Sequence, residues 1–469
     1  MARPELDPRI ARKVLAATSI SYTMVLLDTS IVNVALEQIG LSLGSHVAGL
    51  QWVVNAYTLS FASLLLTGGA LGDRLGARNV YVAGLALFAC ASALCGFAPN
   101  LLTLGCARAL QGVGSALLVP CSLALINRAY PAPAGRASAI GVWMGCGGIA
   151  MASGPLLGGL MIHWLGWRSI FFVNVPVALV GLVLTRSITR DRATRPSHFD
   201  LAGQAAAIIA LGSLIAVLIE GSRCGWRSPI ILSGLALSAA SWLAFLIIEQ
   251  RRADPMLPLT FFRSALFSAS TVVSMASAVV FYGLLFVFSI GYQTIRGDSP
   301  LQAGLAFLPM TVMVALGGLT SGRLVKLFGV RRTMCAAFGM YAAGALGLLA
   351  AGLSASGWLT FVPMLAIGSA AGIVSPAATA PAMGTVTPHR AGVAAAMLNA
   401  ARQSGAALGV AVFGGFISAR PFEAALRIAL ETATAISLVA ALVWWIVSRE
   451  PRTADADIAI DKESISCAE

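Results

Sequence analysis

Apolar stretches of about 20 residues or more follow one another along almost the whole chain of 469 residues. Stretches of this length cross the hydrocarbon core of a bilayer as single α-helices. Apolar residues make up 58% of the chain and charged residues 11%, with a mean hydropathy of +0.84, outside the range of water-soluble globular proteins. The sequence therefore predicts an all-α polytopic membrane protein and leaves no room for a soluble enzyme or DNA-binding domain.

Fourteen membrane spans are predicted, joined mostly by short loops. They cover residues 14–36, 48–71, 80–98, 101–127, 137–163, 168–188, 201–220, 229–249, 265–293, 301–322, 333–354, 358–384, 391–418 and 424–447. An even number of spans puts both termini on one side, and most of the 31 Lys and Arg residues then fall on that side. The positive-inside rule makes this side the cytoplasm, so we expect a multi-pass protein of the cytoplasmic (inner) membrane with both termini inside. The net charge of +12 thus reflects topology, and no nucleic-acid partner is expected.

Two parts of the chain carry the same sequence pattern. Gly69, Leu71, Asp73, Gly76 and Arg78 follow the second span, and Gly322, Leu324, Lys326, Gly329 and Arg331 follow the tenth with the same spacing. Such repeats indicate two related six-helix halves in one orientation, with two helices between them. The predicted domains are a six-helix bundle at 1–195, a two-helix insert and linker at 196–264, a second six-helix bundle at 265–448 and a polar cytoplasmic tail at 449–469.

Four motifs lie in order along the first half of the chain. They are Leu27 to Leu36 in the first span, Gly69 to Arg78 after the second, Arg108 to Gly114 in the fourth and Ser153 to Gly159 in the fifth. Together they resemble the major facilitator superfamily, specifically its fourteen-helix drug:proton antiporter branch with its multidrug exporters and actinobacterial exporters of the methylenomycin-resistance type. Ala150 departs from the family pattern, which has Gly at this position.

The resemblance implies a 6 + 2 + 6 arrangement of transmembrane helices, with a central cavity between two bundles. It implies a proton-coupled secondary transporter that exports small-molecule drugs or antibiotics by alternating access. The proton gradient is the energy source, so no cofactor is expected. The partners expected are a small-molecule substrate, protons and the lipid bilayer, and we expect the protein to work as a monomer. The four His residues lie at or beyond span ends without acidic partners at metal spacing, so no metal site is expected.

Asp28 is the acid that lies well inside a predicted span. An ionised carboxylate in hydrocarbon is costly unless it is paired or hydrated, so such an acid is by default a functional residue. Desolvation favours the protonated form, which suits a group that takes up a proton outside and releases it inside. Counted at 1.5 Å per residue, Asp28 lies about 12 Å and Arg108 about 11 Å below the outer ends of their spans. We therefore predict that Asp28 and Arg108 form the proton-coupling pair. A protonated Asp28 capping a neighbouring helix, and Arg108 as a static tie between helices, are the structural alternatives.

Arg402 is the charge that the second half brings to the membrane interior, near the middle of the thirteenth span. With Arg108 and Asp28 it gives the interior a net positive charge, which favours neutral or anionic substrates over dications. The family has a similar Asn-x-x-Arg-Gln pattern here, so a structural role is the alternative. The residues expected to face the substrate cavity are Trp52, Asn55, Tyr57, Gln111, Asn399 and Arg402, with packing as the alternative for each.

The loop after the second span is predicted to act as a gate. Gly69 and Gly76 would allow a tight turn, and Asp73 would meet an arginine or a helix N-terminus of the other bundle. Lys326 replaces this acid in the second copy, so the latch would be asymmetric; a solvated turn is the alternative. In the fifth span, small residues would let helices approach closely and a proline would bend the helix. The predicted gating residues are Gly69, Asp73, Arg74, Gly76, Arg78, Gly154, Pro155, Gly158 and Gly159.

Other functions remain open at this point. The same fold could export or take up an endogenous metabolite, since sequence indicates direction poorly. A polytopic membrane enzyme is the least favoured, because the chain lacks a cluster of His, Asp or Glu at one membrane face. A nucleotide-driven pump is excluded, because the chain has no G-x-x-x-x-G-K-[ST] loop.

Overall fold

The computed structural model describes residues 8–186, 188, 200–252, 255–352, 357–387 and 390–448. Within these ranges every regular element is a helix. The helices are α1 (Pro8–Leu43), α2 (Val47–Leu75), α3 (Ala77–Phe97), α4 (Leu101–Ala129), α5 (Pro133–Leu165), α6 (Ser169–Phe172), α7 (Asn174–Thr185), α8 (Leu201–Cys224), α9 (Pro229–Arg251), the 3-10 helix η1 (Leu259–Arg263), α10 (Ala265–Thr294), α11 (Pro300–Ala351), α12 (Gly357–Gly384), α13 (Ala391–Ala419) and α14 (Phe422–Val447). The predicted tail at 449–469 lies outside the described residues.

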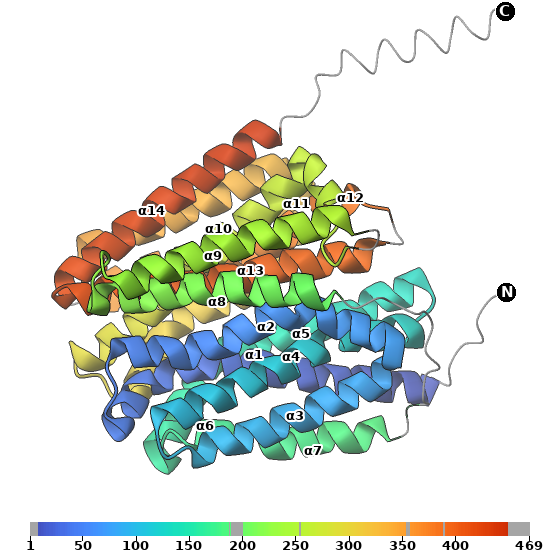
Figure 1. Ribbon diagram of the computed structural model, residues 1–469, viewed down its shortest axis with the longest axis horizontal. Helices are drawn as coiled ribbons and strands as arrows, with labels where there is room; N and C mark the ends of the chain where they lie inside the picture. The colour runs from blue at the N-terminus through green and yellow to red at the C-terminus, as the bar shows by residue number, and fades with distance from the viewer. Residues whose placement is uncertain are drawn as a thin grey trace, which may run out of the picture.

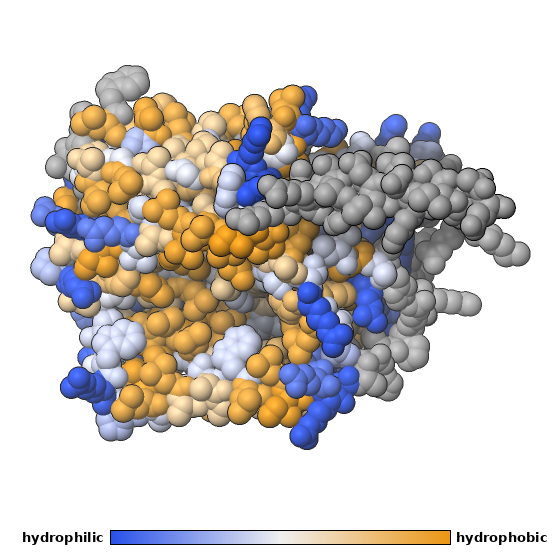
Figure 2. All heavy atoms as spheres, turned by 90° about the horizontal axis from the view of Figure 1, so that it is seen from above, coloured by the Kyte–Doolittle hydropathy of each residue, from blue (hydrophilic) through white to orange (hydrophobic). Residues whose placement is uncertain are grey.

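Each predicted span falls on a helical segment. In the described part of the chain, 11 helices are long and apolar enough to cross a membrane by length and composition. One of them, α11, contains two predicted spans, which meet at Gly329, where the backbone leaves the helical conformation with φ of +78°. The sixth span corresponds to α6 and α7 together, and the thirteenth to α13. Figure 2 shows the expected surface, with a broad apolar zone between two ends where hydrophilic residues gather.

Polar residues fix where several helices begin. The side chains of Asn100, Ser228 and Ser264 each accept a hydrogen bond from the backbone N–H three residues later, at the start of α4, α9 and α10. At the start of α11, Ser299 and Gln302 form a reciprocal capping box. These caps satisfy N–H groups that have no partner within the helix, so short polar linkers suffice between long apolar helices.

The sixth predicted span is not one continuous helix. It breaks at Val173, between α6 and α7. Pro176 explains the break, because proline has no N–H to donate to the Phe172 carbonyl and its ring crowds that position. The break leaves Asn174 as the first residue of α7 in the middle of an apolar segment, where it is 1% exposed.

The helices form two halves with α8 at the seam (Figure 1). Helices α1 to α7 make one half and α10 to α14 the other. They meet mainly where α5 packs on α11 and α2 packs on α13, while α8 packs on both α2 and α13. The start of α1 and the end of α14 lie on the same side of the molecule, as an even number of crossings requires (Figure 1). The bundle boundaries predicted from the sequence stay a proposal.

Helix packing supports the internal repeat. A Cβ placed on Gly112 of α4 would collide with the carbonyl oxygen of Tyr57 in α2, and one placed on Gly368 of α12 would collide with that of Met310 in α11. In the sequence, Gly112 and Pro120 of the first half recur as Gly368 and Pro376 of the second, both displaced by 256 residues. Both halves therefore use a glycine at the same place to bring two helix backbones together.

Candidate functional site

Asp28 of α1 and Arg108 of α4 form an ion pair inside the first half of the molecule. Arg108 Nη1 lies 2.5 Å from Asp28 Oδ2, and the two residues are 1% and 0% exposed. Arg108 also donates from Nε to the Val53 carbonyl at 3.3 Å, and its guanidinium lies 4.3 Å from the centre of the Tyr57 ring. The structure thus pairs the two side chains as their predicted depths indicated. Their role in proton coupling stays a prediction.

Three further polar side chains complete the surroundings of this pair. Gln111 Nε2 and Asn174 Nδ2 each donate to Asp28 Oδ1 at 3.0 Å. Both amides also donate to Ser92 Oγ, again at 3.0 Å. Asp28 therefore accepts three hydrogen bonds, which stabilise its ionised form in a site that solvent does not reach.

Sequence reasoning missed Ser92 and Asn174. The signal for Asn174 was an amide inside an apolar span, two residues before the proline that breaks the helix. Ser92 lies in α3 among alanines and cysteines, where a single serine is common in membrane helices and carries no signal of its own.

Most of the expected cavity residues on α2 and α4 do not face an open space. Gln111 belongs to the Asp28 network, and Tyr57 packs on Arg108 and hydrogen-bonds Ser115 at 2.8 Å. Asn55 is fully buried, and neither atom of its amide finds a partner among the described residues. The prediction that these three line the cavity is wrong for this conformation, because helix packing encloses them.

Trp52 of α2 contacts the inserted helix α8. Its indole Nε1 donates to Glu220 of α8 at 3.2 Å. Trp52 therefore ties α2 to α8, and its place in the substrate cavity stays a prediction. An interfacial tryptophan with a buried ring and a polar N–H partner is a common arrangement near the end of a span.

Arg402 of α13 lies in the second half and is held by neutral groups. Its guanidinium donates to Asn399 Oδ1 at 2.7 Å and to the Ser375 hydroxyl. In the part of the chain that the structure describes, no carboxylate pairs with it. Arg402 and Asn399 are both only partly buried. The positive charge of Arg402 is thus solvated by dipoles and not neutralised.

One aromatic side chain from each half lies near Arg402. Tyr22 of α1 and Tyr282 of α10 lie close enough to interact with it electrostatically. The Tyr22 ring stacks on Trp143 of α5, with ring centres 3.7 Å apart. A Cβ on Gly147 would collide with the Tyr22 ring, so this glycine makes room for the stack. A cation, phenols and an indole therefore gather where the two halves face each other.

The turn after α2 differs from the prediction in one residue. The turn occurs at Gly76, whose φ of +90° favours glycine, and Gly329 repeats it with +78°. Gly69 lies inside α2, in contact distance of Pro120, so it is a packing position and not part of a turn.

Among the described residues, neither Asp73 nor Arg78 is found bridging the two halves. Asp73 and Arg74 are exposed, and among the described residues no group is found paired with Asp73. Arg78 donates from Nε to the Thr185 carbonyl at 3.3 Å, which ties the start of α3 to the end of α7 in the same half. The predicted latch is thus unformed in this conformation.

The small residues of α5 lie between two partner helices. A Cβ on Gly154 or Gly158 would collide with Ser30 or Ile31 of α1, and Ser30 donates to the Met151 carbonyl at 3.0 Å. A Cβ on Gly159 would lie 2.7 Å from the Pro300 carbonyl oxygen of α11. The helix continues through Pro155, whose carbonyl oxygen touches Gly304 of α11. This segment therefore joins the first half to the second by close backbone contact.

Hydrogen bonds between the halves gather toward one end of the molecule. Gln51 of α2 donates to the carbonyls of Val410 and Ala411 in α13, both at 2.9 Å. Gln293 near the end of α10 donates to the Val34 carbonyl of α1 at 3.0 Å. Gln51 lies near the start of α2, and the α1–α2 connection lies at the end opposite the start of α1 (Figure 1). These hydrogen bonds join the two halves toward this end.

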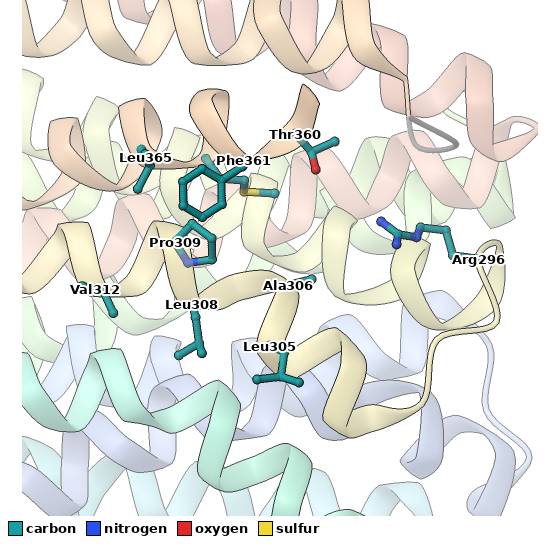
Figure 3. Close-up of a pocket in the computed structure, with 10 residues that line it drawn as sticks. Arg296, Leu305, Ala306, Leu308, Pro309, Val312, Thr360, Phe361 and Leu365 are labelled. Atoms are coloured by element: carbon teal, nitrogen blue, oxygen red, sulfur yellow. The ribbon is translucent and has the colours of Figure 1, made fainter. Parts of the chain in front are cut away.

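A groove of about 500 Å³ lies elsewhere, between α11 and α12 of the second half (Figure 3). Its wall is apolar apart from Arg296 and Thr360, and consists of Arg296, Leu305, Ala306, Leu308, Pro309, Val312, Thr360, Phe361, Met364 and Leu365. Leu305 and Val312 are 47% and 44% exposed, as expected of a surface that faces lipid. The groove is therefore separate from the Asp28 network, which lies in the other half.

Residues 18–410 match the family model of the Major Facilitator Superfamily. The chain belongs to this family. It is a multi-pass membrane transporter of small molecules and not an enzyme, and transporters of this kind need no cofactor. Its fold agrees with that of a bacterial homologue of the human lysosomal transporter Spinster, solved in an inward-facing conformation, with a TM-score of 0.67. That match covers 95% of this chain and 98% of the solved one at 17% identity, so it concerns the fold alone.

The chain is similar to drug-resistance proteins of the Major Facilitator Superfamily. The methylenomycin A resistance protein of Bacillus subtilis is 34% identical over 448 residues, which cover 95% of this chain and 96% of that protein. The multidrug resistance protein Stp of Mycobacterium tuberculosis is 36% identical over 406 residues, which cover 86% and 75%. The resemblance predicted from the motifs is confirmed at the level of the family and of its drug-resistance members.

Proposed function

We propose that this protein exports small drug-like molecules from the cytoplasm in exchange for protons, with Asp28 as the proton site. The observation that carries the proposal is the fully buried Asp28–Arg108 pair inside a Major Facilitator fold. Relatives named for resistance to methylenomycin A and to multiple drugs support the direction of transport.

Arg108 supplies the means of coupling. Arg108 stabilises the carboxylate of Asp28, so formation of the pair favours release of a proton bound to Asp28 toward the cytoplasm, and Asp28 stays ionised while the pair persists. A conformational step that separates the two leaves a buried carboxyl group, which binds a proton because the charged form is poorly solvated. Proton uptake then accompanies the conformation in which the pair is broken.

The orientation follows from the distribution of charge in the sequence. With α1 starting in the cytoplasm, the end toward which hydrogen bonds join the halves is the outer one, and the conformation described here corresponds to a state closed to the outside. Both termini are then cytoplasmic, the membrane is the inner one, and one chain with bundles at 1–195 and 265–448, an insert at 196–264 and a tail at 449–469 is the transporting unit.

Arg402 determines the charge of the substrate. The partners of the half-buried guanidinium are neutral and do not cancel its positive charge. In a site of low dielectric, the electrostatic field of this charge repels cations and attracts carboxylates. The phenols and indole beside it offer flat apolar surfaces to a ring-bearing substrate. Neutral or carboxylate-bearing antibiotics are thus the expected substrates, with Arg402, Asn399, Tyr22 and Tyr282 around them.

A resistance assay tests this function. Expressed in a bacterial host without its own efflux pumps, the protein should raise the inhibitory concentration of neutral or anionic antibiotics, and a protonophore should remove the effect. Lipophilic dications should be poor substrates. Resistance to ethidium-type cations that does not depend on Arg402 would contradict the proposed selectivity, and resistance that survives the protonophore would contradict proton coupling.

A further inference from the structure

The hydrogen bonds around Asp28 have a direction that Ser92 and Arg108 set. Ser92 Oγ donates its single proton to the backbone carbonyl of Phe171 at 2.8 Å. A carbonyl can only accept, so both lone pairs of the Ser92 oxygen remain for incoming donors, and the NH₂ groups of Gln111 and Asn174 fill them at 3.0 Å each. Arg108 Nη1 also donates to Gln111 Oε1 at 2.7 Å, so Arg108 and Ser92 together orient the Gln111 amide, whereas Ser92 orients that of Asn174.

The same two amide groups face Asp28. An amide NH₂ has two hydrogens. On Gln111 and on Asn174, one points to Ser92 and the other to Asp28 Oδ1, each at 3.0 Å. Oδ1 is thus surrounded by donors that cannot accept a hydrogen bond. A proton placed on this oxygen would point at N–H groups, which is unfavourable in a site closed to water.

We infer that Ser92 and Asn174 are positioning residues that restrict proton uptake to Oδ2 of Asp28, the oxygen that Arg108 occupies. The inference rests on the proposed role of Asp28 as the proton site. It goes beyond that role, because it names the atom that takes the proton and the residues that select it. Arg108 Nη1 lies 2.5 Å from Oδ2, and its positive charge disfavours a proton on this oxygen, so uptake at Oδ2 requires Arg108 to withdraw.

The fold holds both residues rigidly. Ser92 lies in α3 and is fully buried, and its acceptor Phe171 belongs to α6. Asn174 begins α7 directly after the break at Val173, and it is 1% exposed. Four helices therefore meet at this serine: α3 itself, α6 through Phe171, α4 through Gln111 and α7 through Asn174.

Infrared titration of the full-length protein in lipid nanodiscs tests the inference without any substrate. The carbonyl band of protonated Asp28 is identified by its loss in Asp28→Asn. Asn174→Ala removes one donor to the carboxylate, so the midpoint of this band should move to higher pH by about one to two units, because the ionised form loses a hydrogen bond. Ser92→Ala removes the acceptor that orients the Asn174 amide, which can then turn its oxygen toward Asp28, and should move the midpoint the same way, whereas Ser92→Thr should stay near the native value.

Ser122→Ala is the matched control. Ser122 is equally buried in the same half, but its hydroxyl bonds only its own helix at Leu118. The inference would be overturned if the band titrates at the same pH in the native protein, Asn174→Ala and Ser92→Ala. It would also be overturned if none of the three proteins shows the band. If Ser92→Ala fails to fold, Asn174→Ala decides alone. Loss of coupled transport in Asp28→Asn together with unshifted titrations would leave the proposed function intact and reject only the role of Ser92 and Asn174.

Discussion

Arg108 and Arg402 are both charges in the membrane interior, but they lie in opposite electrostatic environments. Arg108 is fully buried and neutralised by a carboxylate, whereas Arg402 is partly buried and held by an amide and a hydroxyl. A buried pair suits a group that switches between two ionisation states, and an unneutralised charge suits binding. We therefore propose different roles for the two arginines.

Arg108→Gln should strongly lower the free energy of unfolding of the protein. It leaves Asp28 buried without its counter-charge, which typically costs about 3–5 kcal/mol. Adding Asp28→Asn to this variant should restore much of the lost stability, because no buried charge then remains. Thermal unfolding of the two single variants and the double variant measures the coupling, and strictly additive effects would show that the pair is not an ion pair in the folded protein.

Arg402→Ala should lose anionic substrates first. Apolar contacts supply most of the binding of neutral substrates, so their export should fall less. The measurement is the inhibitory concentration of a carboxylate-bearing antibiotic and of a neutral one, in cells that express the native protein or Arg402→Ala. Equal losses for both would return Arg402 to a structural role.

The sequence predicted the existence of the elements well because each span is a long apolar run with polar ends. It predicted the pairing of Asp28 with Arg108, because helical rise converts positions into depths. It did not predict the break at Val173, since Pro176 could equally lie in a bent helix. It also placed Gln111 and Tyr57 in the cavity, because a hydropathy pattern does not tell which side of a span faces another helix.

At the scale of elements, α5 joins the two halves through glycines that leave no space. Gly159→Ala would bring a methyl group to 2.7 Å from the Pro300 carbonyl oxygen and 2.8 Å from the Leu301 Cα of α11. Since backbone atoms cannot move aside easily, this change should favour the state in which α5 and α11 separate at the outer end. A cysteine introduced near the outer end of α11 should become more reactive toward a membrane-impermeant thiol reagent.

Gly141→Ala provides the control for this prediction. Gly141 lies in the same helix, and no described atom is within 4 Å of a Cβ placed there. This variant should behave as the native protein, or be slightly more stable because alanine favours helix. Equal labelling of Gly159→Ala and Gly141→Ala would mean that the α5–α11 contact does not keep the outer end closed.

At the scale of the whole molecule, the two ends differ: the halves are joined at one end, and the predicted Asp73 latch is not formed at the other. Hydrogen bonds join the halves near the α1–α2 connection, while Asp73 at the other end is exposed. Alternating access requires one end to open as the other closes, so the Asp73 contact belongs to the opposite state.

Asp73→Asn should therefore favour the conformation described here, and Lys326→Ala should have a clearly smaller effect. Labelling of a cysteine introduced on the cytoplasmic side of the cavity reports the population of this state. Equal effects of the two changes would mean that both loops are plain turns.

The central claim is that Asp28 carries the coupled proton. In everted membrane vesicles, addition of an antibiotic that the native protein exports should release protons from the acidified interior. Asp28→Asn should abolish this release while the protein remains folded and inserted, and Glu431→Gln, which changes an exposed acid of α14, should leave it unchanged. Full antibiotic-dependent proton release from Asp28→Asn would contradict the account.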